Sequence, residues 1–158
     1  MTSIGVYVNT WAGIERMLNT FIVQYHEFAN GKLKENGFPS TLNEKIGYLA
    51  TVSKDTRLPV DFRSSVSSWV ERLGQQRDYR HMLIHGLGVR RLSYFEQEWT
   101  FQKLTLKGSK AKLDFKKFSS EELLQAMRNS GDLSHEIAQV LNPILFPDWF
   151  QLSSTNRP

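Results

Sequence analysis

A heptad-like spacing between residues 66 and 87 constrains the fold of this chain more than any other feature of its sequence. The positions follow one another at intervals of four and three residues: Val66, Val70, Leu73, Arg77, Arg80, Ile84 and Leu87. This spacing is typical of one face of an α-helix. It predicts a long helix from about Asp61 to Leu87, with Arg77 and Arg80 on its packing face.

Two helices are predicted before this one. The first has apolar residues at helical spacing over residues 11–28 and ends before Gly31, a residue typical of helix C-termini. The second begins at Ser40 or Thr41, where Glu44 is placed to complete a capping box. Its apolar side is predicted from the same periodicity: Leu42, Ile46, Leu49 and Val52.

After Gly88 the apolar period changes from that of a helix to that of a strand. Alternation with a period of two runs over three segments: residues 89–95, 98–107 and 111–118. Residues 108–109, Gly-Ser, suit a tight turn between the last two. A final helix is predicted from Ser119 or Ser120, with Gly131 as a point where it could kink or break.

These elements predict a mainly α protein. The expected architecture is an up-and-down bundle of about four helices, with a small antiparallel β-hairpin or meander inserted before the last helix. Residues 1–150 are expected to form a single domain that includes the β insertion at about 89–118. Residues 151–158 are expected to form a loose C-terminal tail.

The composition excludes some kinds of chemistry and permits others. There is no cysteine, so disulfides, thiolate metal sites and cysteine nucleophiles are excluded. The formal charge of +4 and the sequence pI of about 9.4 permit an anionic partner such as nucleic acid. Neither a signal peptide nor a membrane span is expected, which makes a cytoplasmic protein the default expectation.

The stretch RDYRHMLIHG, residues 77–86, concentrates ionisable side chains on the predicted packing face. An arginine that faces a core is costly unless it is paired. Three explanations remain open. Arg77 or Arg80 could form a structural ion pair with a carboxylate of a neighbouring helix, the face could be a dimer seam with a polar end, or the arginines could receive a phosphate. The candidate partners for an ion pair are Glu15, Glu27 and Glu44.

The histidines favour phosphate chemistry. His81 and His85 are four residues apart, so they stand on one side of the helix. No third ligand accompanies them, so we expect neither a metal ion nor another cofactor. A histidine that moves protons beside an arginine that stabilises phosphoryl charge can cleave a phosphodiester without metal. The other two histidines, His26 and His135, are expected to be partly exposed surface residues.

Residues 80–86, RHMLIHG, resemble the signature of the HEPN superfamily (higher eukaryotes and prokaryotes nucleotide-binding domains). In that signature an arginine, usually followed by a polar residue, precedes a histidine by four to six intervening positions. Here four residues separate Arg80 from His85, and His81 occupies the polar position. The resemblance covers roughly residues 10–145, with the predicted strands as a departure from the simplest four-helix form.

The resemblance implies a function. Many HEPN domains are metal-independent endoribonucleases of toxin–antitoxin and phage-defence systems, and they dimerise so that two motifs form one composite site. Arg80 would then bind and polarise the scissile phosphate, and His85 would act in proton transfer or position that phosphate. His81 would orient the other two or assist, and Arg77 would support substrate binding. RNA, a second copy of the chain and an antitoxin or regulatory protein are the partners so implied. The alternatives are a non-catalytic HEPN module that binds nucleotide, RNA or protein, and a purely structural helical domain.

Overall fold

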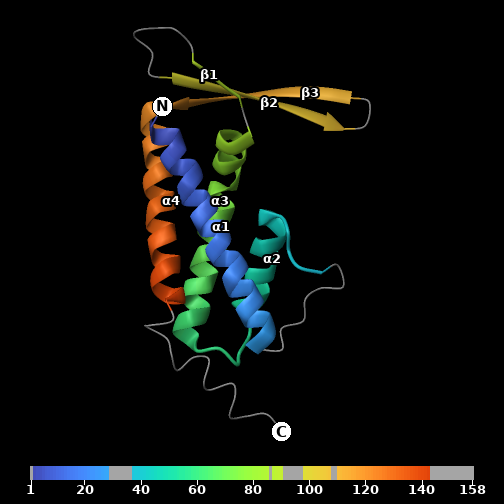
Figure 1. The fold of residues 1–158 in the computed structure, drawn as a ribbon, viewed down its shortest axis with the longest axis vertical. Coiled ribbons are helices and arrows are strands. Elements are labelled where there is room, and N and C mark those ends of the chain that lie inside the picture. The colour runs from blue at the N-terminus through green and yellow to red at the C-terminus, as the bar shows by residue number, and fades with distance from the viewer. Residues whose placement is uncertain (1, 29–36, 86, 91–97, 108–109, 143–158) are drawn as a thin grey trace. The chain divides into compact units, whose positions relative to one another are not determined.

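A computed structural model of the chain describes residues 2–28, 37–85, 87–90, 98–107 and 110–142 (Figure 1). These residues form four helices and one antiparallel sheet, which confirms the predicted mainly α class with a β insertion before the last helix. The elements in chain order are α1 (Thr2–Phe28), α2 (Leu42–Val52), α3 (Val60–His85), β1 (Leu87–Arg90), β2 (Glu98–Lys107), β3 (Lys110–Ser119) and α4 (Ser120–Leu141).

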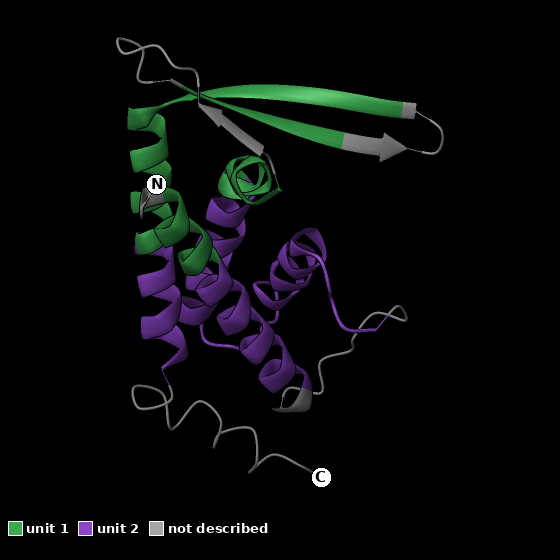
Figure 2. Cartoon of the chain, turned by 45° about the horizontal axis from the view of Figure 1, so that its top comes forward, with its two compact units in different colours: residues 1–11, 75–131 green, residues 12–74, 132–158 purple. Residues whose placement is uncertain are grey.

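The chain divides into two compact units, which Figure 2 shows in different colours. Unit 1 comprises Met1–Trp11 and Gln75–Gly131 and contains the whole sheet. Unit 2 comprises Ala12–Gly74 and Asp132–Pro158 and contains α2. The helices α1, α3 and α4 each contribute residues to both units. The predicted C-terminal tail, residues 151–158, lies outside the described residues.

An aromatic cluster forms the centre of unit 2. The ring of Phe21 on α1 lies 5.7 Å from that of Phe62 and 6.3 Å from that of Trp69, both on α3. Trp69 is fully buried, and its indole Nε1 donates a hydrogen bond of 3.1 Å to Glu136 of α4. Arg72 pairs with the same carboxylate. These contacts tie three helices together through one buried indole.

Helix α2 begins where the sequence predicts it. Thr41 is the N-cap, its hydroxyl accepts from the Glu44 backbone N–H, and the Glu44 carboxylate accepts from the Thr41 backbone N–H. This capping box is the predicted one. The buried side differs from the prediction in part, because Ile46 is only half-buried while Lys45 and Tyr48 are buried. The Lys45 ammonium lies 3.9 Å from the Glu15 carboxylate, which offsets the burial of its charge.

Helix α3 corrects the predicted packing face. Its buried residues include Val66, Trp69, Leu73, Gln76 and Leu83, whereas Arg77 is exposed and Val70 and Ile84 are half-buried. The prediction that Arg77 faces the core is therefore wrong. The large indole of Trp69 takes the buried place that the prediction gave to Val70, so the buried face of α3 is rotated about the helix axis relative to the predicted face. This rotation buries the neutral Gln76 in place of the cation Arg77. Arg80 fits both spacings and is half-buried.

The sheet is an antiparallel meander in the order β1-β2-β3. The strands β2 and β3 pair along their whole length, from Glu98↔Ser119 to Lys107↔Lys110, as the alternation predicts. Strand β1 is Leu87–Arg90, so the first strand begins two residues before its predicted start, and residues 91–97 lie outside the described residues. The predicted turn at residues 108–109 also lies outside them.

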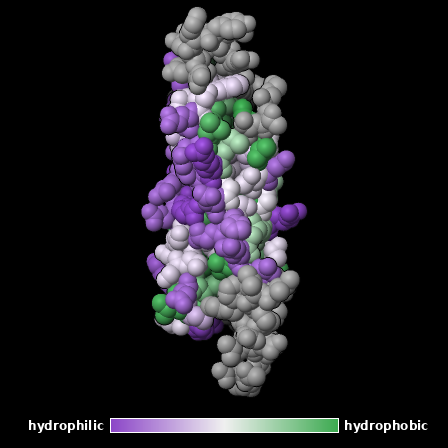
Figure 3. Space-filling model, turned by 90° about the vertical axis from the view of Figure 1, so that its left-hand side faces the viewer, coloured by the Kyte–Doolittle hydropathy of each residue, from purple (hydrophilic) through white to green (hydrophobic). Residues whose placement is uncertain are grey.

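Helix α4 is continuous from Ser120 to Leu141, without the break that Gly131 made conceivable. Ser119 and Glu122 exchange hydrogen bonds at its start, since each backbone N–H donates to the other's side chain. The helix is amphipathic, and polar side chains gather over the middle of the face that Figure 3 shows. His135 is exposed on α4 and His26 is half-buried on α1, which agrees with the surface positions predicted for them.

A hydrogen-bonded group in unit 2 is centred on the carboxylate of Asp55. The Arg57 guanidinium and the Tyr25 hydroxyl both donate to the Asp55 carboxylate, with Arg57 Nη2 at 2.6 Å. These bonds, that from Arg57 foremost, lower the pKa of Asp55. Burial and the bond to Asp55 raise the pKa of Tyr25 to about 12, so the tyrosine remains a donor at neutral pH.

Substitution Asp55→Asn is expected to lower the free energy of unfolding at pH 7 by about 1–2 kcal/mol, because it removes a charged acceptor shared by two donors. A carboxyl with a lowered pKa stabilises the fold above its unfolded pKa of about 3.9, and this contribution is lost as pH falls below that value. The difference in unfolding free energy between wild type and variant should therefore become progressively smaller below about pH 4. Urea unfolding at pH 7, 5 and 3 measures it. A gap that stays constant with pH would contradict the ionic origin.

Candidate functional site

Four basic side chains meet in unit 1, at the C-terminal end of α3. The Nη1 of Arg80 lies 3.4 Å from Nε2 of His85, with the arginine as donor. The rings of His81 and His85 have centroids 5.2 Å apart at an angle of 64°. The fourth member, Lys103 of β2, hydrogen-bonds to Nε2 of His81 through its Nζ. The structure thus brings together the three residues predicted as catalytic and adds a lysine.

The partners of the two histidines define their tautomers. Arginine has donors only, so Nε2 of His85 must accept from it. A protonated lysine likewise has donors only, so Nε2 of His81 accepts when Lys103 carries its charge. In this arrangement each neutral imidazole carries its proton on Nδ1 and turns its lone pair toward a cation. Both proton acceptors are therefore occupied by Arg80 and Lys103 until another acceptor engages those cations.

Unit 1 also contains a buried tyrosine. Tyr7 of α1 is 1% exposed, and burial raises the pKa of its hydroxyl, opposed by Trp11 and by the positive charge of Arg80. Trp11, one turn after Tyr7, is fully buried, and the two rings are 6.2 Å apart. Arg80 itself is half-buried, so its interaction with His85 is screened less than it would be in water.

Arg77, predicted to support substrate binding, occupies a different position. Its side chain is about half-exposed, and its Nε lies 3.4 Å from the carboxylate of the adjacent Asp78. Two of the carboxylates considered as buried partners have other contacts, because Glu44 completes the capping box and Glu15 lies beside Lys45. The side chain of Glu27 lies outside the described residues. Arg77 can still attract an anion from the surface, but it is not part of the four-residue group.

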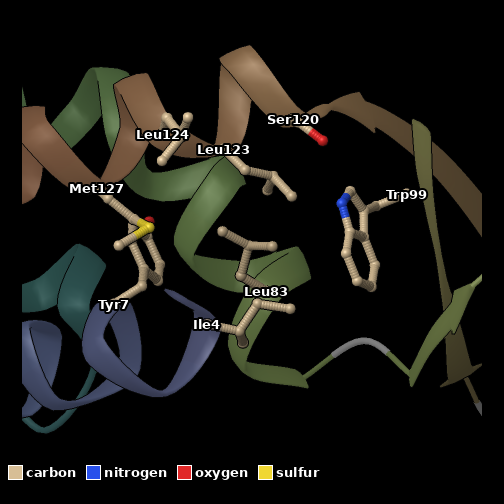
Figure 4. A pocket seen from close by; sticks show the side chains of 8 residues that line it. All are labelled: Ile4, Tyr7, Leu83, Trp99, Ser120, Leu123, Leu124 and Met127. Carbon is tan, nitrogen blue, oxygen red and sulfur yellow. The ribbon is translucent and has the colours of Figure 1, made fainter. Parts of the chain in front are cut away.

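A pocket opens in unit 1, with Leu83 of α3 in its lining (Figure 4). Its volume is about 190 Å³, and its walls are mainly apolar side chains such as Leu83 and Leu123. Trp99 of β2 lies at one end, with Met127 and Tyr7 at the other. Tyr7, the buried tyrosine described above, is one of the residues that line the pocket.

Sequence reasoning missed Lys103 and Tyr7. Lys103 lies on the same side of β2 as the buried Phe101, so strand alternation could have assigned it to the inner side of the sheet. Which helix that side covers depends on contacts distant in sequence, and no local pattern reports them. Tyr7 lies one turn before Trp11 on the apolar stripe of α1, so extending that stripe toward the N-terminus would have marked it as buried.

The described residues contain no cluster of three His, Cys, Asp or Glu side chains that could hold a metal ion. None of the helices in the described part of the chain is long and apolar enough to cross a membrane. No family model, no curated protein and no solved structure matches this chain. The residues of the site are therefore the basis for a functional assignment.

Proposed function

We propose that the chain is a metal-independent endoribonuclease of the HEPN type. The observation that carries the proposal is the contact of Arg80 with His85 beside the Lys103–His81 pair. Two imidazoles and two cations supply proton transfer and charge stabilisation, which are the two requirements for cleaving RNA without metal. The residues that resemble the HEPN signature are thus three of the four members of this group.

The first step of the reaction is an attack by the ribose 2′-oxygen on the adjacent phosphorus. The new O2′–P bond forms as the P–O5′ bond breaks, a proton leaves the 2′-hydroxyl, and a proton arrives at O5′. Arg80 stabilises the negative charge that develops on the phosphoryl oxygens. His85 takes up the 2′-hydroxyl proton, a water molecule donates the proton that O5′ receives, and His81 orients the group. The products of this step are a 2′,3′-cyclic phosphate and a 5′-hydroxyl.

Before substrate binds, Nε2 of each histidine accepts a hydrogen bond from a cation, and substrate binding can release it. A phosphate is a stronger partner for Arg80 and Lys103 than a neutral imidazole, because both partners then carry charge. When the phosphate draws these cations to its oxygens, Nε2 of each histidine becomes available to accept a proton. Substrate binding thereby activates the base. A second copy of the chain would complete the site by setting a second Arg80–His85 pair opposite the first, and a toxin or phage-defence role would follow from such an activity.

The test is incubation of purified protein with a mixed-sequence RNA in excess EDTA. Wild type is expected to cleave, and Arg80→Ala is expected to lose about 10²- to 10³-fold in rate, the typical cost of removing one donor that stabilises transition-state charge. The exposed Arg128 of α4 offers a matched control, and Arg128→Ala should cleave like wild type. Equal cleavage by all three proteins would sink the proposal. Binding of RNA without any cleavage would favour the non-catalytic module instead.

Lys103→Ala is expected to lower the cleavage rate by about 10- to 100-fold, the equivalent of removing one hydrogen bond to a charged group. The physical reason is that His81 loses the donor that fixes its tautomer and ring orientation. Single-turnover cleavage in EDTA measures the rate, and Lys54→Ala, at an exposed position of unit 2, is the control. A Lys103→Ala rate within twofold of wild type would show that the lysine has no part in the reaction.

A further inference from the structure

The net positive charge of this chain is concentrated in one element, the β2–β3 hairpin. The sequence 98–119, which covers β2, β3 and their connection, contains six lysines and only two acidic residues, Glu98 and Asp114. Its formal charge of +4 equals that of the whole chain, so basic and acidic residues balance in the remainder. A field of one sign on one element steers a polyanion toward that element. Lys103 joins this element to the basic group around Arg80 through its bond to His81.

The two sides of this hairpin differ in what they contact. The inner side packs within unit 1, where Phe101 and Phe118 are buried with ring centroids 5.6 Å apart. On the same side, Lys116 places its ammonium 4.9 Å from the ring centroid of Tyr79 on α3. With Lys103 against His81, the inner side thus fixes the hairpin to α3 at several points. The residues of the outer side take no part in these contacts with α3.

The outer side exposes apolar and basic side chains together. Leu104 and Leu113 are cross-strand partners, and Phe115 lies two residues beyond Leu113, so all three project from this side. They are 60%, 48% and 63% exposed, respectively. Lys117, two residues beyond Phe115, is also exposed on this side. An exposed phenyl ring is costly to leave in water, and three neighbouring apolar residues on a strand pair indicate a binding surface.

The hairpin also extends beyond the rest of the sheet. Within the described residues, β1 pairs with β2 between Trp99 and Gln102, and residues 103–107 pair with β3 alone. Figure 1 shows β2 and β3 continuing as a two-stranded ribbon past β1. Lys112 lies on this ribbon, with a side chain that is 77% exposed and an ammonium 2.7 Å from Asp114. Strand alternation gives Lys112 the opposite side from Phe115, but β3 is an edge strand, so a long lysine side chain can reach a backbone that runs along this edge.

We propose that the outer side of the β2–β3 hairpin binds single-stranded RNA, with a base stacked on Phe115 and phosphates held by Lys117 and, at the β3 edge, by Lys112. Sheet surfaces that recognise single strands combine aromatic rings for the bases with cations for the backbone. A second copy of the chain fits poorly here, because two hairpins of charge +4 repel each other. This inference rests on the proposed function for its choice of RNA, and it adds a substrate-holding arm joined through Lys103 to the reacting group.

Binding to a labelled single-stranded RNA with 2′-O-methyl riboses tests the proposal on the full chain, because such RNA cannot undergo 2′-hydroxyl attack. Fluorescence anisotropy at several salt concentrations gives the dissociation constant and its salt slope. Phe115→Ala is expected to weaken binding by roughly 5- to 100-fold, the range for one stacked base. The double variant Lys112→Gln/Lys117→Gln is expected to reduce the slope of log K against log salt by about 1.4, or 0.7 for each phosphate that the protein no longer neutralises.

Matched controls lie on unit 2. Val60→Ala removes an apolar side chain that is 64% exposed, and Arg16→Gln/Lys54→Gln removes two exposed charges. Both controls should bind RNA like wild type. All the changed positions are exposed, so each variant is expected to fold. Wild-type affinity for Phe115→Ala together with an unchanged salt slope for the lysine pair overturns the proposal. So does a halved solution mass in the Phe115→Ala variant, which would make the surface a protein contact.

The two proposals fail in different ways. Hairpin-dependent binding of the methylated RNA, without cleavage of ordinary RNA in EDTA, would remove the nuclease assignment and leave the binding surface in place. Cleavage of ordinary RNA by wild type, with hairpin variants that bind and cleave as wild type does, would keep the nuclease assignment and remove the binding surface.

Discussion

Replacing His85 by alanine is expected to slow RNA cleavage by roughly 10²- to 10⁴-fold, the usual contribution of a positioned proton-transfer group. His85 is the imidazole in contact with Arg80 and is exposed at the end of α3, so an incoming phosphate can reach it. Single-turnover rates in EDTA measure the effect. Because the side chain is exposed, the variant should retain its fold, with a change in unfolding free energy within about 0.5 kcal/mol.

The matched control for this result is His135→Ala. His135 is also an exposed helical histidine, and its ring contacts Gln139 one turn further along α4. It should cleave RNA at the wild-type rate. Equal losses in both variants would indicate a general effect of removing a histidine, and equal wild-type rates would exclude His85 from the chemistry.

The largest effect on stability is expected from Trp69→Ala, at about 3–5 kcal/mol in the free energy of unfolding. Trp69 is fully buried, contacts Phe21 and Phe62, and donates to Glu136. The substitution removes a large apolar surface from the core and leaves a cavity that three helices cannot fill without moving. Urea unfolding followed by circular dichroism measures the change.

Two further variants separate the loss of apolar volume from the loss of the indole hydrogen bond. Trp69→Phe keeps most of the apolar volume but removes the Nε1 donor, so its loss should be smaller than that of Trp69→Ala. Val60→Ala, at a position that is 64% exposed, should change stability by less than about 0.5 kcal/mol. A Trp69→Ala loss below about 1 kcal/mol would contradict the role of this indole as the centre of unit 2.

The parts of the fold that local signals determine were predictable. The capping box of Thr41 and Glu44 needs only four consecutive residues, and strand alternation needs only the pleat, so both appear at the predicted places. The rotation of α3 was not predictable from spacing. A pattern with a period of 3.5 assigns Arg77 and Gln76 almost equally well to the buried face, and the volume of Trp69 and the desolvation of a cation decide between them.

The residues of the candidate site were likewise predictable only where local spacing determines their positions. Arg80, His81 and His85 lie within six residues of one helix, so their proximity follows from helix geometry. Lys103 is 22 residues away from its partner His81 and reaches it only because the inner side of the sheet packs against α3. Arg77, which the sequence grouped with the others, points to solvent beside Asp78. Local spacing thus predicted three members of the group, while tertiary packing supplied the fourth.

The most direct test of the central claim is the chemistry of the RNA ends after wild-type protein has acted in EDTA. Mass spectrometry of the fragments is expected to find 2′,3′-cyclic phosphates and 5′-hydroxyls, with both species strongly reduced for Arg80→Ala and His85→Ala. Intact RNA after prolonged incubation would contradict the account, and so would fragments with 3′-hydroxyl and 5′-phosphate ends.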